Sequence, residues 1–226
     1  MKAMSTMGDQ AVRIEVEEGV SLDGRLHLPA DAAMGSVFCH PHPLHEGTMD
    51  NKVVSTFHRA MRDVGAACLR FDFRGNREST GTYDDGVGEQ RDLARAIGLL
   101  TEELPPGAPI VIGGYSFGSA VALAYTRAQI EPRPAGLILV APPCAFHSLL
   151  ADLPPPDAPR PLTVVCGTQD EFCPIESLDQ WVNAAEVPLS VFRIEGADHF
   201  FTGHGAALRR LADQIARSFA SRVVVC

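Results

Sequence analysis

The strongest constraint on how this chain can fold is a five-residue stretch, Gly-Tyr-Ser-Phe-Gly, at Gly114–Gly118. The run Ile110–Gly113 before it is rich in β-branched residues and predicts a short strand. The run Ser119–Tyr125 after it begins with small residues and predicts a helix. The chain must turn sharply between this strand and this helix. Such a turn has a strained backbone, and glycines on either side of the serine tolerate it. The pattern therefore predicts that Ser116 is presented at the end of a strand, with a helix packed closely on the sheet.

The rest of the chain alternates apolar runs typical of strands with amphipathic runs typical of helices. An antiparallel pair, Val12–Glu17 and Arg25–Leu28, is expected around a turn at Asp23-Gly24. Further strands are predicted at Gly35–Cys39, Ala66–Phe71, Ile110–Gly113, Gly136–Val140, Leu162–Cys166 and Leu189–Ile194. Helices are predicted at Lys52–Val64, Gly88–Glu103, from Ser116, near Ile175–Ala185 and at Ala206–Ala220. We therefore expect an α/β fold, with a mostly parallel sheet of about seven or eight strands and helices on both faces. No linker or repeat interrupts this pattern, so residues 1–226 are expected to form one domain.

Charge, hydrophobicity and cysteine spacing disfavour several classes of partner and cellular location. The net charge of −9 disfavours nucleic acid as a partner. No apolar run approaches the roughly 20 residues of a membrane span, so no membrane partner is expected. The N-terminal residues lack the apolar core of a signal peptide, and the six cysteines include no C-x-x-C pair. We therefore expect a reduced, cytoplasmic protein in which Cys39, Cys68 and Cys166 are buried. The apolar tail Val223–Cys226 either ends the last helix or contacts a second copy in a homodimer.

One segment is informative because it is short. Ala141–Pro161 connects two predicted strands and contains seven prolines, at positions 142, 143, 154, 155, 156, 159 and 161. Proline at this density prevents a regular helix. The segment therefore predicts a small, open site without a lid domain.

The groups needed to activate Ser116 follow two later strands. A serine hydroxyl needs a base within hydrogen-bond reach, and that base needs an orienting acid. Asp170 and His199 each follow a predicted parallel strand, where open α/β sheets build their sites. Glu171 and Asp198 are rival acids, and His204 is a rival base. The residues around Glu171 predict a turn that faces solvent. Asp198 is the direct chain neighbour of His199, which places its carboxylate badly for orienting the imidazole. His204 is less favoured as the base because it lies at the start of the last predicted helix.

When a serine nucleophile attacks a carbonyl group, the carbonyl oxygen becomes an oxyanion. Two backbone N–H donors are needed to stabilise this oxyanion. Phe117, directly after Ser116, supplies one. The second is expected from the loop after strand Gly35–Cys39, where proline has no N–H and His42 or Leu44 therefore remains, with His42 preferred. His40, His42 and His45 could suggest a metal, but no carboxylate set supports one. We therefore expect no metal and no cofactor.

These motifs together resemble the α/β-hydrolase superfamily and, within it, a group of small bacterial hydrolases without a lid. The matching stretches are His40–Pro43 with Gly47–Val54, Leu69–Gly75, Gly114–Gly118, Gly167–Asp170 and Gly196–His199. The resemblance implies Ser116 as nucleophile, Asp170 as acid and His199 as base. It also implies a small acyl ester or thioester as substrate, hydrolysed through an acyl-serine. An acyltransferase, amidase or peptidase with the same triad is the alternative, followed by a non-catalytic binding protein on this fold.

Several other residues receive expected roles. Arg74 is expected to be structural, pairing with Asp72 or with loop carbonyls, in preference to binding substrate. Asp50 and Asn51 are expected to cap the helix that begins near Lys52. Four aromatic side chains are candidates for an apolar acyl pocket: Tyr115, Phe172, Phe200 and Phe201.

Overall fold

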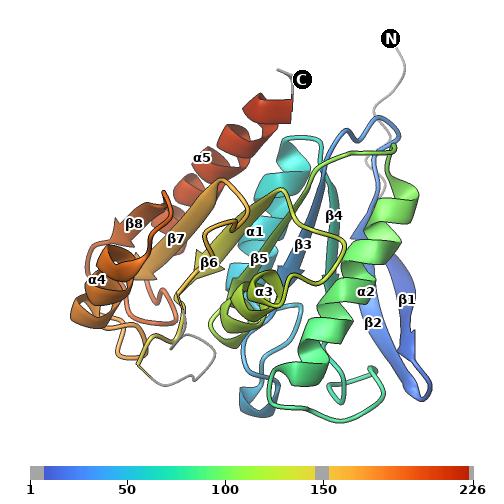
Figure 1. Ribbon diagram of the computed structural model, residues 1–226, viewed down its shortest axis with the longest axis horizontal. Coiled ribbons are helices and arrows are strands. Elements are labelled where there is room, and N and C mark those ends of the chain that lie inside the picture. Colours follow the sequence, from blue (N-terminus) through green and yellow to red (C-terminus); the bar gives the residue numbers. More distant parts are fainter. Residues whose placement is uncertain (1–7, 146–152, 224–226) are drawn as a thin grey trace.

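A single sheet of eight strands forms the centre of the molecule (Figure 1). The structure is a computed structural model, and it describes residues 8–145 and 153–223. The strands are β1 (Gln10–Glu17), β2 (Val20–His27), β3 (Gly35–Cys39), β4 (Ala67–Phe71), β5 (Ile110–Tyr115), β6 (Gly136–Val140), β7 (Leu162–Gly167) and β8 (Ser190–Ile194). They lie in the order β1-β2-β4-β3-β5-β6-β7-β8. In this order all pairings from β4 to β8 are parallel, whereas β2 pairs antiparallel with both of its neighbours, β1 and β4. The predicted α/β fold with a mostly parallel sheet is therefore confirmed.

The predicted turn at Asp23-Gly24 is wrong, because both residues lie inside β2. The chain turns between β1 and β2, where Gly19 has a φ of 78°. Glycine takes such a positive φ without steric cost. Gly24 instead allows close packing, since a Cβ at that position would lie 3.1 Å from Val12 Cγ2.

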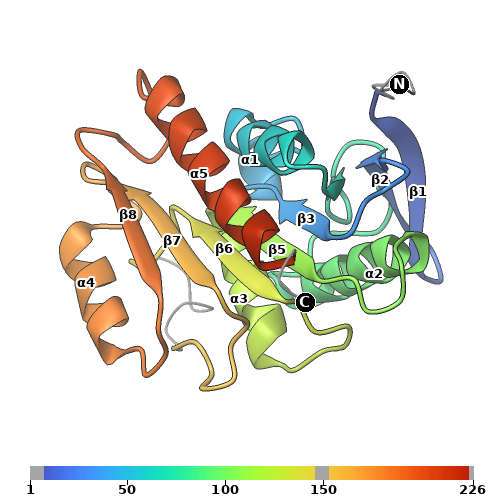
Figure 2. The same ribbon diagram turned by 90° about the horizontal axis from the view of Figure 1, so that it is seen from above.

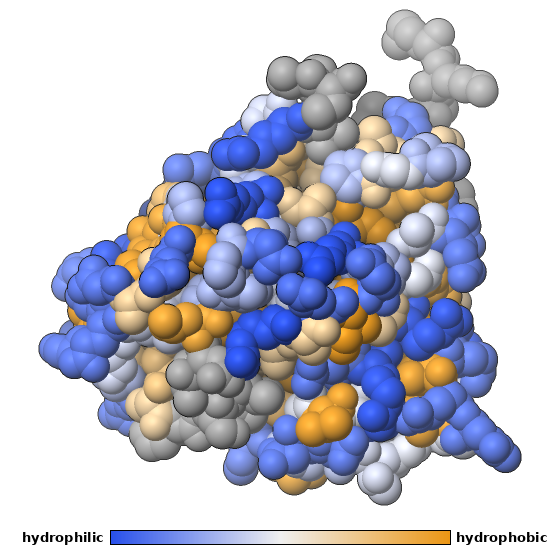
Figure 3. Space-filling model, viewed as in Figure 1, coloured by the Kyte–Doolittle hydropathy of each residue, from blue (hydrophilic) through white to orange (hydrophobic). Residues whose placement is uncertain are grey.

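Helices cover both faces of the sheet (Figure 2). The helices are α1 (Lys52–Asp63), α2 (Val87–Glu103), α3 (Phe117–Arg127), α4 (Ile175–Ala184) and α5 (Gly205–Val223), with a short 3₁₀ helix η1 at Pro43–His45. The apolar sides of α1 and α5 form one half of the core with one sheet face, and those of α2, α3 and α4 form the other half. Strands β3, β5, β6 and β7 are buried throughout, as expected for strands covered on both faces. On the face shown in Figure 3, hydrophobic residues form small patches between hydrophilic ones.

The connection between β6 and β7 contains no helix or strand within residues 141–145 and 153–161. This agrees with the expectation that its prolines prevent a regular helical lid. Residues 146–152 lie outside the described part of the chain, as do residues 224–226 of the apolar tail. Within the described residues, no helix combines the length and the apolar character that crossing a membrane requires.

Candidate active site

Ser116 lies at the turn between β5 and α3 in a strained backbone conformation, with φ 53° and ψ −119°. A positive φ is uncommon for a residue other than glycine and marks stored strain. The flanking glycines serve close packing: a Cβ on Gly114 would lie 2.2 Å from Gly118 C, and one on Gly118 would lie 2.5 Å from His40 O. The turn therefore presents the Ser116 side chain half-buried at the carboxyl edge of the sheet.

Three residues far apart in the sequence form a continuous hydrogen-bond chain at this edge. Ser116 Oγ lies 3.0 Å from His199 Nε2. His199 Nδ1 lies 2.9 Å from both carboxylate oxygens of Asp170. Asp170 and His199 are both buried, with 4% and 6% exposure. With its Nδ1–H donated to Asp170, the imidazole has Nε2 available to accept the serine proton.

Backbone groups hold the acid and the histidine in place. Asp170 Oδ1 accepts N–H donors from Phe172, at 2.8 Å, and Cys173, at 2.9 Å. The Tyr115 hydroxyl donates to the His199 carbonyl over 3.0 Å. Tyr115 therefore connects the serine turn directly to the loop that carries His199.

The structure places the rival residues elsewhere. The side chain of Glu171 is exposed. Asp198 accepts the N–H of Thr202 within its own loop, and His204 Nδ1 donates to the Thr202 carbonyl. None of these three rivals belongs to the chain of hydrogen bonds that ends at Ser116.

His40 links the loop after β3 to the loop after β4 through hydrogen bonds. Its Nδ1–H donates to the Pro41 carbonyl, at 2.6 Å, and its Nε2 accepts the N–H of Phe73, at 3.0 Å. Both ring nitrogens of His40 therefore have hydrogen-bond partners. Burial lowers the pKa of His40 to about 4. Within the described residues, no group of three or more His, Cys, Asp or Glu side chains is placed to hold a metal ion.

The pKa of His40 predicts a contribution to the pH dependence of stability. Between pH 6.5 and 4 the unfolded chain binds a proton at this residue that the folded chain excludes. Acidification from pH 8 to pH 5 should therefore remove roughly 2 kcal/mol of stability through this group. Urea unfolding of the wild type and of His40→Asn at both pH values measures this. We expect the stability difference between the two proteins to shrink at pH 5, and an unchanged difference would contradict the assignment.

A second hydrogen-bond chain fixes the side chain of His42. The N–H of Leu44 donates to His42 Nδ1, at 3.3 Å, and the Tyr83 hydroxyl donates to Asp85, at 3.0 Å. His42 Nε2 lies 3.2 Å from the Tyr83 oxygen, which leaves Nε2 as the donor. The His42 ring also packs against Phe117, with 4.9 Å between ring centroids.

The candidate oxyanion donors differ in their surroundings. Phe117 and His42 both line the pocket that contains Ser116. The N–H of Leu44 is engaged with His42 Nδ1, and the Leu44 side chain points to solvent with 67% exposure. The preference for His42 over Leu44 as the second donor stays a prediction.

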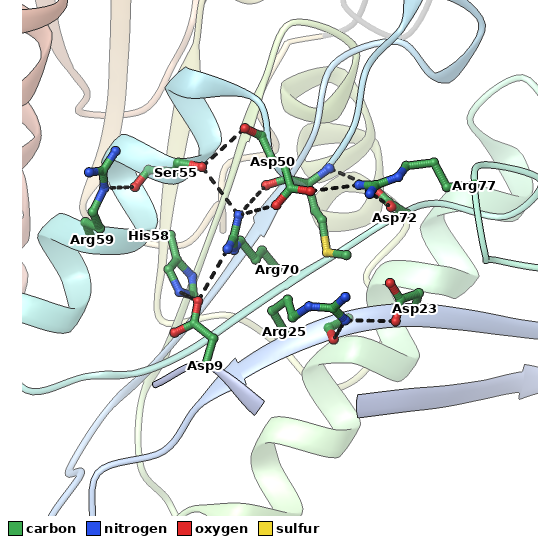
Figure 4. A network of polar contacts seen from close by, with 12 residues as sticks. Asp9, Asp23, Arg25, Asp50, Ser55, His58, Arg59, Arg70, Asp72 and Arg77 are labelled. Carbon is green, nitrogen blue, oxygen red and sulfur yellow. Dashed lines mark hydrogen bonds and ion pairs between the residues drawn. The ribbon is translucent and has the colours of Figure 1, made fainter. Parts of the chain in front are cut away.

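A polar network anchors the loop that follows η1 (Figure 4). Arg70 on β4 donates to the Met49 carbonyl and to Asp50, and Asp50 also pairs with Arg77. The N–H of Met49 donates to the buried carboxylate of Asp72, whose pKa burial raises to about 6. These contacts hold the segment that supplies two pocket-lining residues, Gly47 and Asn51.

Two of the expected roles are corrected here and one is confirmed. Arg74 is structural, as expected, but its partners are Asp92 on α2 and Glu17 on β1. Asn51 caps α1 by accepting the N–H of Val53. Asp50 has no capping role, since its carboxylate lies between Arg70 and Arg77.

The pocket around Ser116 has a volume of about 640 Å³ and a largely aromatic wall. Tyr115, Phe172 and Phe200 line it as expected, whereas Phe201 is buried beneath Tyr115. Sequence reasoning missed Tyr83, which reaches the pocket from the loop before α2. Two carboxylates, Glu46 and Asp85, also line it, and the described lining residues include no lysine or arginine.

The fold agrees with comparisons to known proteins. The profile of the alpha/beta hydrolase family matches residues 37–162. The chain belongs to this family. An uncharacterized protein of Rickettsia prowazekii is 33% identical over 168 residues, which span 72% of this hydrolase and 69% of that protein.

Two solved structures extend the similarity to nearly the whole hydrolase. An alpha-beta serine hydrolase homologue from Coxiella burnetii is 33% identical, with a TM-score of 0.79 over 92% of this chain and 97% of that one. A serine hydrolase from Xanthomonas campestris, described as being without a lid, is 29% identical, with a TM-score of 0.81 over 94% and 95% of the two chains. The resemblance expected from the sequence motifs is therefore confirmed for the family and for the fold.

Proposed function

We propose that this hydrolase cleaves carboxylic esters through an acyl-serine intermediate. The observation that carries the proposal is the hydrogen-bond chain from Ser116 Oγ through His199 to Asp170, with links of 3.0 and 2.9 Å. A serine nucleophile, a base within reach and a buried orienting carboxylate are the parts that acyl transfer requires.

The proposed reaction has two halves. Ser116 Oγ attacks the ester carbonyl carbon while its proton moves to His199 Nε2, and Asp170 stabilises the resulting imidazolium. The N–H groups of Phe117 and His42 stabilise the oxyanion of the tetrahedral intermediate. The carbonyl–oxygen bond to the leaving group then breaks as His199 returns the proton to the alcohol. In the second half, water attacks the acyl-serine with His199 as base, which releases the carboxylic acid and restores Ser116.

The charge of the pocket supports esters over nucleotide-bearing thioesters. Glu46 and Asp85 are both acidic, and none of the described lining residues is a lysine or arginine. The whole chain also carries a net charge of −9. An acyl-CoA brings several phosphate charges, which this pocket would repel. Uncharged or cationic leaving groups face no such repulsion, and cations also gain from the aromatic wall.

A fluorophosphonate probe tests the nucleophile. Such probes react with a serine whose hydroxyl is activated by a neighbouring base. We expect one adduct on the folded protein, located at Ser116 by peptide mapping. Heat-denatured protein, in which the triad is dispersed, serves as the control. Failure of the folded protein to react would overturn the proposal.

A set of matched substrates tests the charge preference. Acetylcholine is cationic, 3,3-dimethylbutyl acetate is its uncharged isostere, and 2-acetoxyethanesulfonate is anionic. We expect kcat/KM to fall in that order, and we expect the preference to weaken at high salt. Asp85→Asn should reduce the preference for cation over anion by about 3-fold to 10-fold. Asparagine tolerates the positive φ of 48° at this position.

The control for this variant is Glu176→Gln, which removes one negative charge on α4 outside the pocket. It should leave the charge preference unchanged. Equal kcat/KM values for the three substrates would show that the lining carboxylates do not select the substrate.

A further inference from the structure

Two thiols face each other beside the loop of the catalytic acid. Cys144 follows β6 and Cys173 follows β7, and their sulfur atoms lie 3.7 Å apart. Cys144 is partly exposed, whereas Cys173 is completely buried. A backbone contact from Ala145 N–H to the Phe172 carbonyl, at 3.4 Å, keeps the two loops adjacent.

We propose that Cys144 and Cys173 form a dithiol site that small disulfides, such as glutathione disulfide, convert into an intramolecular disulfide, and that this modification lowers the activity. The effect on activity rests on the proposed function, whereas formation of the disulfide does not. The two claims therefore fail separately.

The surroundings of the two sulfur atoms indicate which thiol reacts first with the small disulfide. The thiol of Cys173 donates a hydrogen bond to the sulfur of Cys144, which lowers the pKa of Cys144. The same hydrogen bond, together with burial, raises the pKa of Cys173. The partly exposed Cys144 is thus the thiol that reaches the oxidant as a thiolate, and thiolates are the attacking species in disulfide exchange.

The exchange balances without any further reagent. The Cys144 thiolate attacks one sulfur of glutathione disulfide, forms a mixed disulfide and releases one glutathione thiolate, which takes up the proton that Cys144 has lost. The Cys173 sulfur then attacks the Cys144 sulfur, and its proton passes to the departing second glutathione. Two protein thiols are oxidised, and one glutathione disulfide is reduced to two glutathione molecules.

The other described cysteines are poor competitors. Cys39, Cys68 and Cys166 are buried in strands, as the sequence predicted. Burial raises the pKa of all three thiols, which suppresses their thiolate forms. Among the described cysteines, Cys144 is thus the one that combines exposure with a neighbouring thiol.

The bond would move groups that belong to the active site. A disulfide has a sulfur–sulfur distance of about 2.05 Å, so the two loops must approach each other. The N–H of Cys173 donates to Asp170 Oδ1, and Pro143, the neighbour of Cys144, lines the pocket. Displacement of a catalytic group by about 1 Å can cost about 100-fold in rate. We therefore expect oxidation to lower kcat by at least about tenfold.

The test exposes the 226-residue chain to buffers of increasing glutathione disulfide to glutathione ratio, followed by alkylation of the remaining thiols. Tandem mass spectrometry of the unreduced digest should find Cys144 joined to Cys173, and hydrolysis of p-nitrophenyl acetate should fall in parallel. Dithiothreitol should restore the activity. Cys144→Ser should keep its activity in every buffer, and Cys226→Ser, the matched control, should respond as the wild type does.

Each outcome decides a separate claim. Glutathione that stays attached to Cys144, or a Cys144 that stays unmodified, overturns the dithiol site. A Cys144–Cys173 disulfide with unchanged hydrolysis overturns the effect on activity. A protein without any esterase activity overturns the proposed function, while the peptide map still decides the dithiol site.

Discussion

Ser116→Ala should lower kcat for a short p-nitrophenyl ester by at least about 10⁴-fold, because removal of the nucleophile abolishes the acyl-serine route. Residual turnover would come from the oxyanion donors and from binding alone. The substitution deletes only the oxygen that lies 3.0 Å from His199 Nε2. The positive φ of 53° at this residue strains alanine as it strains serine, so the fold should remain intact. Steady-state kinetics and circular dichroism on the same preparation measure both expectations.

Ser218→Ala is the matched control for this variant. Ser218 lies on α5, where its hydroxyl donates to the Ile215 carbonyl one turn earlier. Its loss should leave kcat unchanged. If Ser116→Ala kept most of the activity while remaining folded, another residue would have to be the nucleophile.

Asp92→Ala should be the most destabilising of the substitutions considered, with a loss of about 3–5 kcal/mol. Asp92 lies on α2 and is completely buried, and its Oδ1 accepts two guanidinium donors of Arg74, at 2.7 and 2.9 Å. Its Oδ2 accepts the N–H of Arg74 at 3.0 Å. Without this carboxylate, the ionic partner that Arg74 keeps among the described residues is the exposed Glu17, and a buried charge loses most of its compensation. Denaturant unfolding measures the loss.

A double substitution separates this explanation from simple loss of packing. Arg74→Met combined with Asp92→Leu removes both charges and keeps apolar volume at both positions. Such replacements of buried ion pairs are often nearly neutral. We expect the double variant to be more stable than Asp92→Ala alone. A double variant that is at least as unstable as the single one would show that the hydrogen bonds themselves, and not an uncompensated charge, account for the loss.

Local sequence patterns determined much of the fold. The apolar runs of β3, β5, β6 and β7 are continuous because these strands are covered on both faces, and such runs can be found in the sequence. The positions of Asp170 and His199 after predicted strands also led to the two residues that the structure joins to Ser116. The carboxyl ends of parallel strands meet at one edge of a sheet, so position along the chain predicts proximity in space.

The tertiary structure alone decided which distant polar groups meet. Arg74 could have paired with Asp72, two residues earlier, but its side chain reaches Asp92 on α2. Tyr83 enters the pocket because the loop before α2 folds against His42, and nothing in the local pattern of that loop indicates this. The contact between Cys144 and Cys173 likewise depends on how the loops after β6 and β7 pack together.

There is a physical reason why the fold elements could be predicted from the sequence and the distant polar contacts could not. Hydrophobic periodicity is a local property, because a strand or helix must turn its own apolar side chains toward the core. The turn at Gly19 and the partner of a buried charge depend instead on strand register and loop packing, which many residues set together. The sequence by itself therefore determined the layers of this hydrolase, the serine turn and the order of the three candidate catalytic residues. The tertiary structure decided the walls and charge of the pocket, the partner of Arg74 and the meeting of the two thiols.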